Sequence, residues 1–235
     1  MFIKSKKIDH TALDALVNAG LNRHLAKFYS ARGIKHIDDA TLLIEKIIPP
    51  EALTNNTLMA SILADAILQK HKILIIGDYD TDGATSTAVG VRALKMMGAE
   101  VDYLVPNRFE FGYGLTPEIV DLAKEKNPKI IITVDNGIAS VEGVNQANQY
   151  GIDVLVTDHH LPGETLPHAK CIVNPNQHGC SFPSKYLCGV GVIFYVMLAL
   201  RAELRKRDYF KDNIEPNLMQ LIDLVALGTV ADLVP

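Results

Sequence analysis

Three short apolar runs, at residues 73–76, 130–134 and 154–157, constrain the fold of this chain more than any other feature. Each run is rich in Ile, Val and Leu. The segments between them repeat apolar residues at three- and four-residue spacing, which is typical of amphipathic helices. Near-continuous apolar strands are buried on both faces, and strands that alternate with helices form parallel sheets. The sequence therefore predicts an α/β fold in which a parallel sheet is covered by helices on both faces.

The same alternation locates the elements of the main domain. Strands are expected at residues 73–76, 101–105, 130–134, 154–157 and 169–173, and helices at residues 58–69, 84–97, 116–126, 140–150, 191–206 and 217–227. Parallel sheets of this kind bind ligands at the carboxyl ends of their strands. The residues that follow each strand are therefore the first candidates for a functional site.

The first 50 residues are expected to form a separate helical segment. Apolar residues at helical spacing predict helices at residues 11–19, 22–30 and 38–47, and Pro49 and Pro50 then interrupt the pattern. The chain is thus expected to divide into an N-terminal helical segment, residues 1–50, and a main domain, residues 51–235.

Composition limits the class of protein. Hydrophobic residues make up 48% of the 235 residues, which permits a sizeable core, and no apolar run is long enough to cross a bilayer. No signal peptide opens the sequence. We therefore expect no membrane association. Because Cys171, Cys180 and Cys188 form no Cys-x-x-Cys pair, we expect free thiols in a reducing cytoplasm. The net charge of −4 gives no hint of nucleic acid, whose binding surfaces are usually basic.

Polar side chains cluster where three of the predicted strands end. They are Asp78, Asp80 and Asp82 after the first strand, Asp135 with Asn136 after the strand at 130–134, and Asp158, His159 and His160 after the strand at 154–157. Like charges so placed repel one another unless a cation lies among them. Carboxylates with imidazoles suit Mn²⁺, Mg²⁺, Fe²⁺ or Zn²⁺, and the absence of cysteine argues against a structural zinc site.

Each cluster also has a simpler explanation when it is taken alone. Residues 78–83 match the start of an EF-hand loop, but Val89 stands where a bidentate glutamate is needed. Asp-Gly and Asp-Asn pairs are typical of turns, and a single histidine is more often part of a core. Glycine pairs at residues 112–114 and 189–191 are incomplete dinucleotide fingerprints. Arg108 is either a surface residue or a cationic group that binds a phosphate. Three polar clusters at one edge favour the metal site.

Four segments in sequence order, residues 77–86, 134–138, 157–160 and 226–235, resemble the four motifs of the DHH phosphoesterase superfamily. Residues 106–108 and 111–115 add to the resemblance, which covers residues 50 to 235 and is most similar to the single-strand-specific DNA exonucleases of the superfamily. It implies a hydrolase with two Mn²⁺ or Mg²⁺ ions that degrades single-stranded DNA from 5′ to 3′. The implied product is mononucleotides, and the implied processes are DNA repair and recombination.

The resemblance also implies roles for individual residues. The implied metal ligands are Asp80, Asp82, Asp135, His159 and Asp223. Asp135 is expected to bridge the two metals, and His160 and Arg108 are expected to contact the substrate phosphate. Asp158 is expected to support an imidazole, which gives a catalytic group of Asp135, Asp158, His159 and His160.

Three further residues have uncertain roles. Asp232 is the alternative to Asp223 as the ligand from the fourth motif, and Asp223 is preferred because of its distance along the chain from the histidine pair. Asp78 is expected to support its loop rather than bind metal. Asn136 is a candidate through its position beside Asp135.

The expected partners are single-stranded DNA, a single-strand-binding protein and a helicase. We expect the natural protein to continue past Pro235, because nothing here matches the DHH-associated domain or the oligonucleotide-binding domain of the resembled proteins. Two rival functions remain. One is another substrate for the same chemistry, as in an oligoribonuclease, a cyclic-dinucleotide phosphodiesterase or a pyrophosphatase. The other is a metal-free scaffold module in a replication complex.

Overall fold

The computed structural model describes residues 6–40 and 47–234, apart from the side chain of Arg108, in two compact units, Met1–Ile48 and Pro49–Pro235. The first unit contains α1 (His10–Asn18), α2 (Arg23–Ser30) and α3 (Ile37–Ala40). Its small core consists of Leu13, Leu16 and Ala26. A third helix was expected at residues 38–47. The structure has α3 at its start, and residues 41–46 lie outside the described residues.

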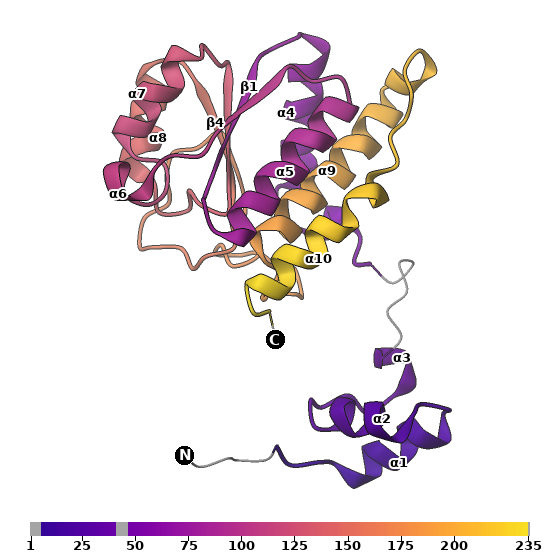
Figure 1. The fold of residues 1–235 in the computed structure, drawn as a ribbon. Coiled ribbons are helices and arrows are strands. Elements are labelled where there is room, and N and C mark those ends of the chain that lie inside the picture. Colours follow the sequence, from indigo (N-terminus) through magenta and orange to yellow (C-terminus); the bar gives the residue numbers. More distant parts are fainter. Residues whose placement is uncertain (1–5, 41–46, 235) are drawn as a thin grey trace. The chain divides into compact units, whose positions relative to one another are not determined.

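The second unit is built on a five-stranded parallel sheet in the order β2-β1-β3-β4-β5 (Figure 1). The strands are β1 (Ile73–Gly77), β2 (Val101–Leu104), β3 (Ile130–Val134), β4 (Asp153–Thr157) and β5 (Cys171–Val173). The two central strands β1 and β3 are buried at every position, as their apolar sequences require. In this register the carboxyl ends of β1, β3 and β4 lie side by side, because Gly77 pairs with Val134 and Val134 pairs with Thr157.

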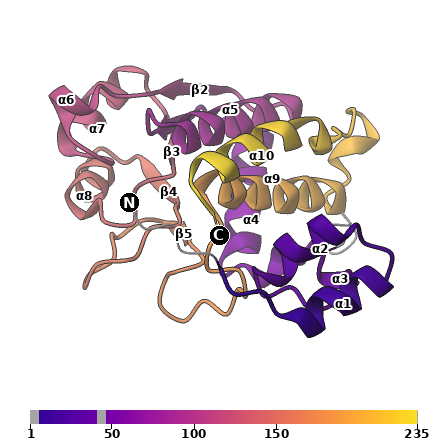
Figure 2. The same ribbon diagram turned by 60° about the horizontal axis from the view of Figure 1, so that its bottom comes forward.

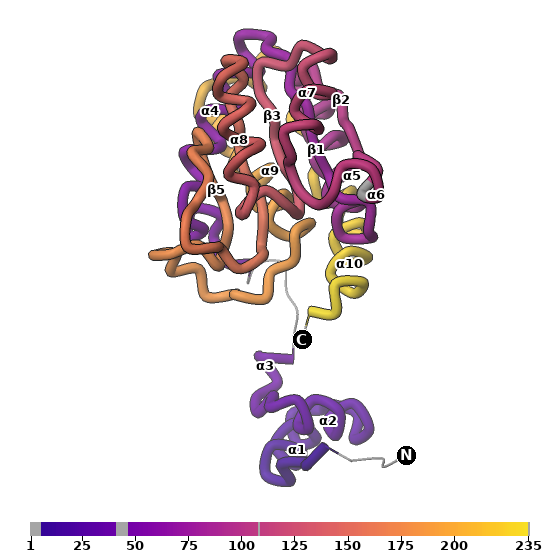
Figure 3. Tube along the Cα trace, turned by 90° about the vertical axis from the view of Figure 1, so that its left-hand side faces the viewer, coloured from indigo at the N-terminus to yellow at the C-terminus, as the bar shows by residue number. Residues whose placement is uncertain are grey.

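Helices cover both faces of the sheet, which confirms the predicted fold class. On one face lie α7 (Pro117–Glu125) and α8 (Val141–Gln149), which share an apolar core with Leu74 and Ile76 of β1 (Figure 3). On the other face lie α4 (Asn56–Leu68), α5 (Thr81–Met96), α9 (Gly189–Lys206) and α10 (Ile222–Ala231). There α5 approaches β1 so closely that a Cβ on Gly90 would meet Ile75 at 2.8 Å. Figure 2 shows α10 beside α5 and α9.

Short helices complete the unit, namely η2 (Pro50–Ala52), α6 (Arg108–Phe111), η3 (Tyr209–Lys211) and η4 (Leu218–Leu221). No helix of the described part of the chain is both long and apolar enough to span a membrane.

Three helix boundaries differ from the prediction in ways that matter for the site. The predicted helix at 84–97 begins at Thr81, because the Asp80 carboxylate caps it by accepting a bond from the Gly83 amide at 2.9 Å. The predicted helix at 191–206 begins at Gly189. The predicted helix at 217–227 divides into η4 and α10, and α10 runs on to Ala231.

Candidate metal centre

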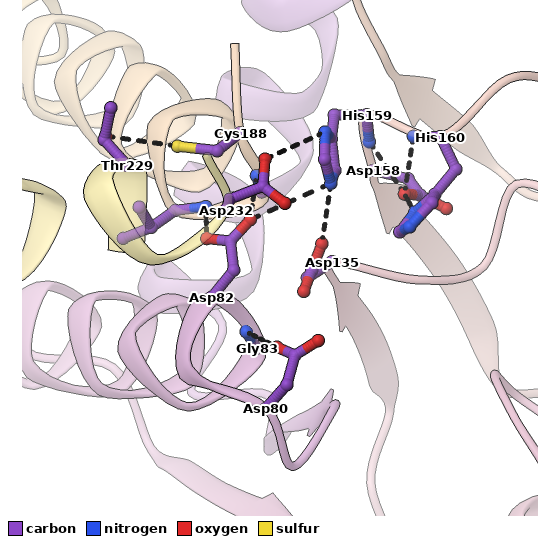
Figure 4. A network of polar contacts seen from close by, with 12 residues as sticks. Asp80, Asp82, Gly83, Asp135, Asp158, His159, His160, Cys188, Thr229 and Asp232 are labelled. Atoms are coloured by element: carbon purple, nitrogen blue, oxygen red, sulfur yellow. Dashed lines mark hydrogen bonds and ion pairs between the residues drawn. The ribbon is translucent and has the colours of Figure 1, made fainter. Parts of the chain in front are cut away.

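Acidic and imidazole side chains from four segments meet at the carboxyl edge of the sheet (Figure 4). The loop after β1 and the first turn of α5 supply Asp80 and Asp82, and the ends of β3 and β4 supply Asp135 and His159. Asp232, at the C-cap of α10, supplies a fifth side chain. Parallel strands end at the same edge of a sheet, so the places of three of these four segments follow from the topology alone.

Asp82 is held by the start of a helix that lies far away in the sequence. Its side chain is buried, and its two oxygens accept bonds from the backbone amides of Gly189 at 2.7 Å and Val190 at 2.8 Å. These amides belong to the first turn of α9, where backbone donors have no partner inside the helix. Burial raises the pKa of Asp82, whereas the two amides lower it. The carboxylate is thus fixed in position by donors that leave its charge only partly compensated.

Asp135 occupies a strained backbone position directly after β3. Its φ is +59°, a left-handed conformation that few residues other than glycine adopt. Its Oδ1 is buried and forms an ion pair with the protonated His159 ring, whose Nε2 lies 3.0 Å away, but it accepts no hydrogen bond from the described residues. Burial raises the pKa of Asp135 to about 7, and the Asp82 and Asp80 carboxylates add to the rise while His159 opposes it.

The His159 ring lies between three carboxylates. Besides its 3.0 Å approach to Asp135, its Nε2 lies 3.8 Å from Asp82 Oδ2 and its Nδ1 lies 3.9 Å from Asp232 Oδ2. Burial opposes protonation of the imidazole, but the neighbouring Asp135 carboxylate outweighs it and raises the pKa of His159. The two longer distances exceed hydrogen-bond length, so the ring faces those carboxylates without bonding to them.

Asp158 orients the neighbouring histidine, His160. The Asp158 side chain is buried and accepts four bonds, from the Ile138 amide at 2.9 Å, the His159 amide at 2.7 Å, the His160 amide at 3.1 Å and His160 Nδ1 at 2.7 Å. Burial works to raise the pKa of Asp158, but these donors, His160 first, hold it below its ordinary value. The same bond raises the pKa of His160 to about 9.

Tyr113 is a part of the site that sequence reasoning did not single out. Its hydroxyl donates to the backbone carbonyl of Asp135 at 3.1 Å and lies 3.4 Å from His160 Nδ1. Gly112 and Gly114 on either side both have positive φ, so the chain turns sharply to present the ring. The glycine pair was noted only as an incomplete dinucleotide fingerprint. The two glycines do indicate a sharp turn. A single sequence does not show that this turn lies beside the end of a distant strand.

The structure brings Asp232 to the cluster and leaves Asp223 outside it. Asp223 lies in the first turn of α10, where it accepts a bond from the Leu224 amide. Asp232 lies nine positions further along the helix, a distance of about 13 Å at 1.5 Å per residue. This placement runs against the preference for Asp223 as the ligand from the fourth motif.

The other predicted residues have varied positions. Asn136 donates to the carbonyls of Ile76 at 3.2 Å and Val134 at 2.8 Å, so its amide joins β1 to β3 rather than facing the cluster. Asp78 lies close enough to Asp80 and Asp135 to share an ion with them. The side chain of Arg108 lies outside the described residues, so its assignment to a substrate phosphate remains a prediction.

The arrangement fits divalent cations by its donor chemistry. Among the described residues, three groups place one donor atom of each member within 4.8 Å of the others: Asp82, His159 and Asp232; Asp78, Asp80 and Asp135; and Asp135, His159 and His160. Asp135 Oδ1 and His159 Nε2 lie 3.0 Å apart, close enough for both atoms to bind one ion. Oxygen and imidazole donors without thiolate suit Mn²⁺ and Mg²⁺.

Comparisons with known proteins identify the family of this chain. The model of the DHH family, N-terminal domain, matches residues 72–229. The single-stranded-DNA-specific exonuclease RecJ of Escherichia coli (strain K12) is 48% identical over 236 residues, which cover 99% of this chain and 40% of the relative. The RecJ of Thermus thermophilus is 35% identical over 178 residues, which cover 75% of this chain and 24% of the relative. The chain therefore spans two fifths of the length of these curated relatives, or less.

Two solved structures have the same fold. The crystal structure of exonuclease RecJ bound to manganese has a TM-score of 0.69 and 34% identity, covering 80% of this chain and 46% of that chain. RecJ of Thermus thermophilus in complex with Mn²⁺ has a TM-score of 0.72 and 30% identity, covering 96% and 30% of the two chains. The match of the family model over more than half of the sequence decides the classification: this chain belongs to the DHH family.

Proposed function

We propose that this chain hydrolyses phosphodiester bonds with two Mn²⁺ or Mg²⁺ ions. One observation carries the proposal. Two groups of potential ligands share no residue: one is Asp82, His159 and Asp232, and the other is Asp78, Asp80 and Asp135. Asp135 also lies close enough to His159 to share an ion with it, and its buried Oδ1 accepts no hydrogen bond from the described residues. A carboxylate with two oxygens between two groups of ligands suits a pair of cations that share it. The exonucleases of known structure cited above, which contain Mn²⁺, support the choice of metal.

The proposed ligands are Asp80, Asp82, Asp135, His159 and Asp232. Asp232 replaces Asp223 in this set, because α10 presents its C-terminal end to the cluster. Asp78 is added as a candidate, because it lies in one group with Asp80 and Asp135. When bound, two divalent cations supply a water molecule of lowered pKa and compensate charge on the phosphate.

The protein's own groups fix the geometry for this reaction. The α9 amides of Gly189 and Val190 hold Asp82, so a ligand oxygen needs no rearrangement when an ion binds. Asp158 orients His160, whose side chain is 48% exposed and can donate a hydrogen bond to a phosphate oxygen. Asp158 itself is already saturated with protein donors, so we assign it the orientation of His160 and not a contact with substrate.

The proposed substrate is single-stranded DNA, degraded from 5′ to 3′ into mononucleotides during DNA repair and recombination. The names of the relatives support this choice, and the Escherichia coli exonuclease is 48% identical over 99% of this chain. Within that function we also propose a cytoplasmic location, and a single-strand-binding protein and a helicase as partners.

Mononucleotide release from 5′-phosphorylated single-stranded DNA, in Mn²⁺ and in EDTA, tests the proposal. Release is expected in Mn²⁺, slower release or none from duplex DNA, and none in EDTA. Asp135→Ala should abolish release and weaken Mn²⁺ binding measured by calorimetry. Asp223→Ala is the matched control, because it removes an exposed aspartate about 13 Å from Asp232 along the same helix. Metal-dependent release at the wild-type rate by Asp135→Ala would refute the assignment.

A further inference from the structure

The N-terminal unit has a helix face that its own core does not use. The core packs against Ala26 of α2, and Ser30, one turn further along, is buried as well. Phe28 lies about 200° around the helix from Ala26, at 100° per residue. Its side chain is 63% exposed and that of Leu25 is 50% exposed. An exposed phenylalanine and leucine one turn apart form an apolar patch on the outer face of α2.

Basic residues surround this patch and acidic residues are absent from it. Between Asp14 and Asp38 the chain has no Asp or Glu, but it has Arg23, Lys27, Arg32 and Lys35. All four are exposed, and none is in an ion pair with another residue that the structure describes. The Arg32 guanidinium is adjacent to the patch, since its Nη1 donates to the Phe28 carbonyl at 3.4 Å. The positive charge on this face is therefore available to an external anion.

The two units differ in the sign of their charge. Residues 1–48 contain 8 Lys and Arg against 5 Asp and Glu, a net charge of +3. The remaining residues contain 15 against 22, a net charge of −7, and together they give the −4 of the whole chain. A polyanion that reaches the acidic cluster is repelled by most of the second unit unless cations screen it. The N-terminal unit offers the opposite charge.

We propose that the outer face of α2, formed by His24, Leu25, Lys27, Phe28 and Arg32, binds single-stranded DNA. Cationic side chains meet the phosphates, and an exposed aromatic ring stacks on a base, which is how sequence-independent single-strand sites are built. Bases inside a duplex are stacked on one another and cannot use the ring, so a single strand is favoured over a duplex. The choice of DNA as the ligand rests on the proposed function, but the exposed apolar and basic character of this surface is independent of it.

The test is equilibrium binding of the whole chain to a 3′-fluorescein oligo(dT) of about 20 nucleotides, long enough for any single-strand site of ordinary size. Anisotropy is measured in EDTA, so that no hydrolysis occurs, over a series of salt concentrations. Phe28→Ala should weaken binding by about fivefold or more at every salt concentration, because a stacked base is lost. The double variant Lys27→Ala/Arg32→Ala should lower the slope of log affinity against log salt by about 1.4, at 0.7 for each phosphate contact.

Matched controls lie on the second unit. Tyr103→Ala removes a ring that is 53% exposed, and Arg92→Ala/Lys95→Ala removes an exposed arginine and lysine from α5. Both controls should leave affinity and slope unchanged. Circular dichroism should show every variant folded, because each replaced side chain is on the surface.

Wild-type affinity and slope in both α2 variants would overturn the proposal. So would equal losses in the control variants, or tight binding of an acidic, apolar peptide at this face with unchanged binding of DNA, which would identify a protein partner instead. Because binding is measured without metal, these outcomes are independent of whether the chain hydrolyses DNA. Loss of hydrolysis with intact α2-dependent binding would contradict only the proposed function.

Discussion

Asp135→Asn is expected to stabilise the metal-free protein above pH 7 while it removes metal binding. The reason is the unfavourable position of this carboxylate. It is buried beside Asp82 and Asp80, and these surroundings raise its pKa from 3.8 to about 7. Asparagine has nearly the same shape, carries no charge, and tolerates the left-handed backbone that Asp135 adopts at φ +59°. The substitution therefore removes the charge and preserves the fold.

The sign and size of this stabilisation follow from the pKa of Asp135. A carboxyl group with a raised pKa in the folded state favours folding while it is protonated, and this contribution is lost as pH rises toward 7. Between pH 5 and pH 7 the free energy of unfolding of the wild type falls by about 1.36 kcal/mol for each pH unit, which is about 3 kcal/mol in all. Asp135 and His159 each affect the protonation of the other, so the pH range belongs to the pair. The asparagine variant does not lose this stability, because its side chain does not ionise.

Thermal unfolding in EDTA at pH 5 and pH 8.5 measures the effect. The advantage of Asp135→Asn over the wild type should grow between these two values by about 3 kcal/mol, or about 6–12 °C in Tm for a domain of this size. Mn²⁺ at 100 times its Kd should narrow the difference at pH 8.5 by about 2.7 kcal/mol, because it binds and stabilises only the wild type. A variant with the same Tm as the wild type at both pH values would refute the argument that Asp135 is held in an unfavourable charged state.

Asp158→Asn is the matched control, and the expected sign is opposite. Asp158 is as deeply buried as Asp135, but it accepts four bonds and its pKa lies below the ordinary value. Its charge contributes to stability above pH 4 and this contribution is lost as pH falls through its folded pKa. Removing the charge should cost about 2–3 kcal/mol at neutral pH, since the bonds to His160 and the Ile138 amide are charge-assisted. If both substitutions shifted stability in the same direction, burial alone would explain the effect and the argument from specific partners would fail.

Three further predictions concern the supports of the cluster. Asp232→Ala should reduce Mn²⁺ affinity measured by calorimetry at least tenfold, whereas Asp223→Ala should leave it unchanged; the reverse result would restore the preference for Asp223. Tyr113→Phe removes only the hydroxyl that bonds the Asp135 carbonyl, so we expect a loss of about 0.5–1.5 kcal/mol in unfolding free energy and a lower kcat with little change in KM. Gly189→Ala places a Cβ 2.6 Å from Asp135 Oδ1, so Mn²⁺ binding should fall steeply, and a wild-type affinity would show that α9 can move away.

The sheet was predictable from the sequence because its determinants are local. An uninterrupted run such as Ile73–Gly77 has no polar residue to face water, so the strand must lie between two layers. Parallel connection then brings the ends of β1, β3 and β4 to one edge, and the prediction that Asp82, Asp135 and His159 lie close together follows from that geometry. Strand ends are defined to within a residue by composition, so this inference was insensitive to small errors in boundaries.

The contribution of α10 was not predictable in the same way, and the reason lies in its sequence. This helix has hydrophobic residues on every side, yet of its ten residues only Gly228 is buried. Without an apolar stripe, its pattern indicates neither which face packs nor where the helix ends. A small residue decides its position: a Cβ on Gly228 would lie 2.5 Å from Thr85 Oγ1 and 3.1 Å from Asp82 Oδ1. Close approach of α10 to α5 at this glycine carries the following turn, with Asp232, to the cluster, and leaves Asp223 at the far end. Spacing along the chain could rank these two aspartates only by distance from the histidines, whereas their positions depend on packing between helices far apart in sequence.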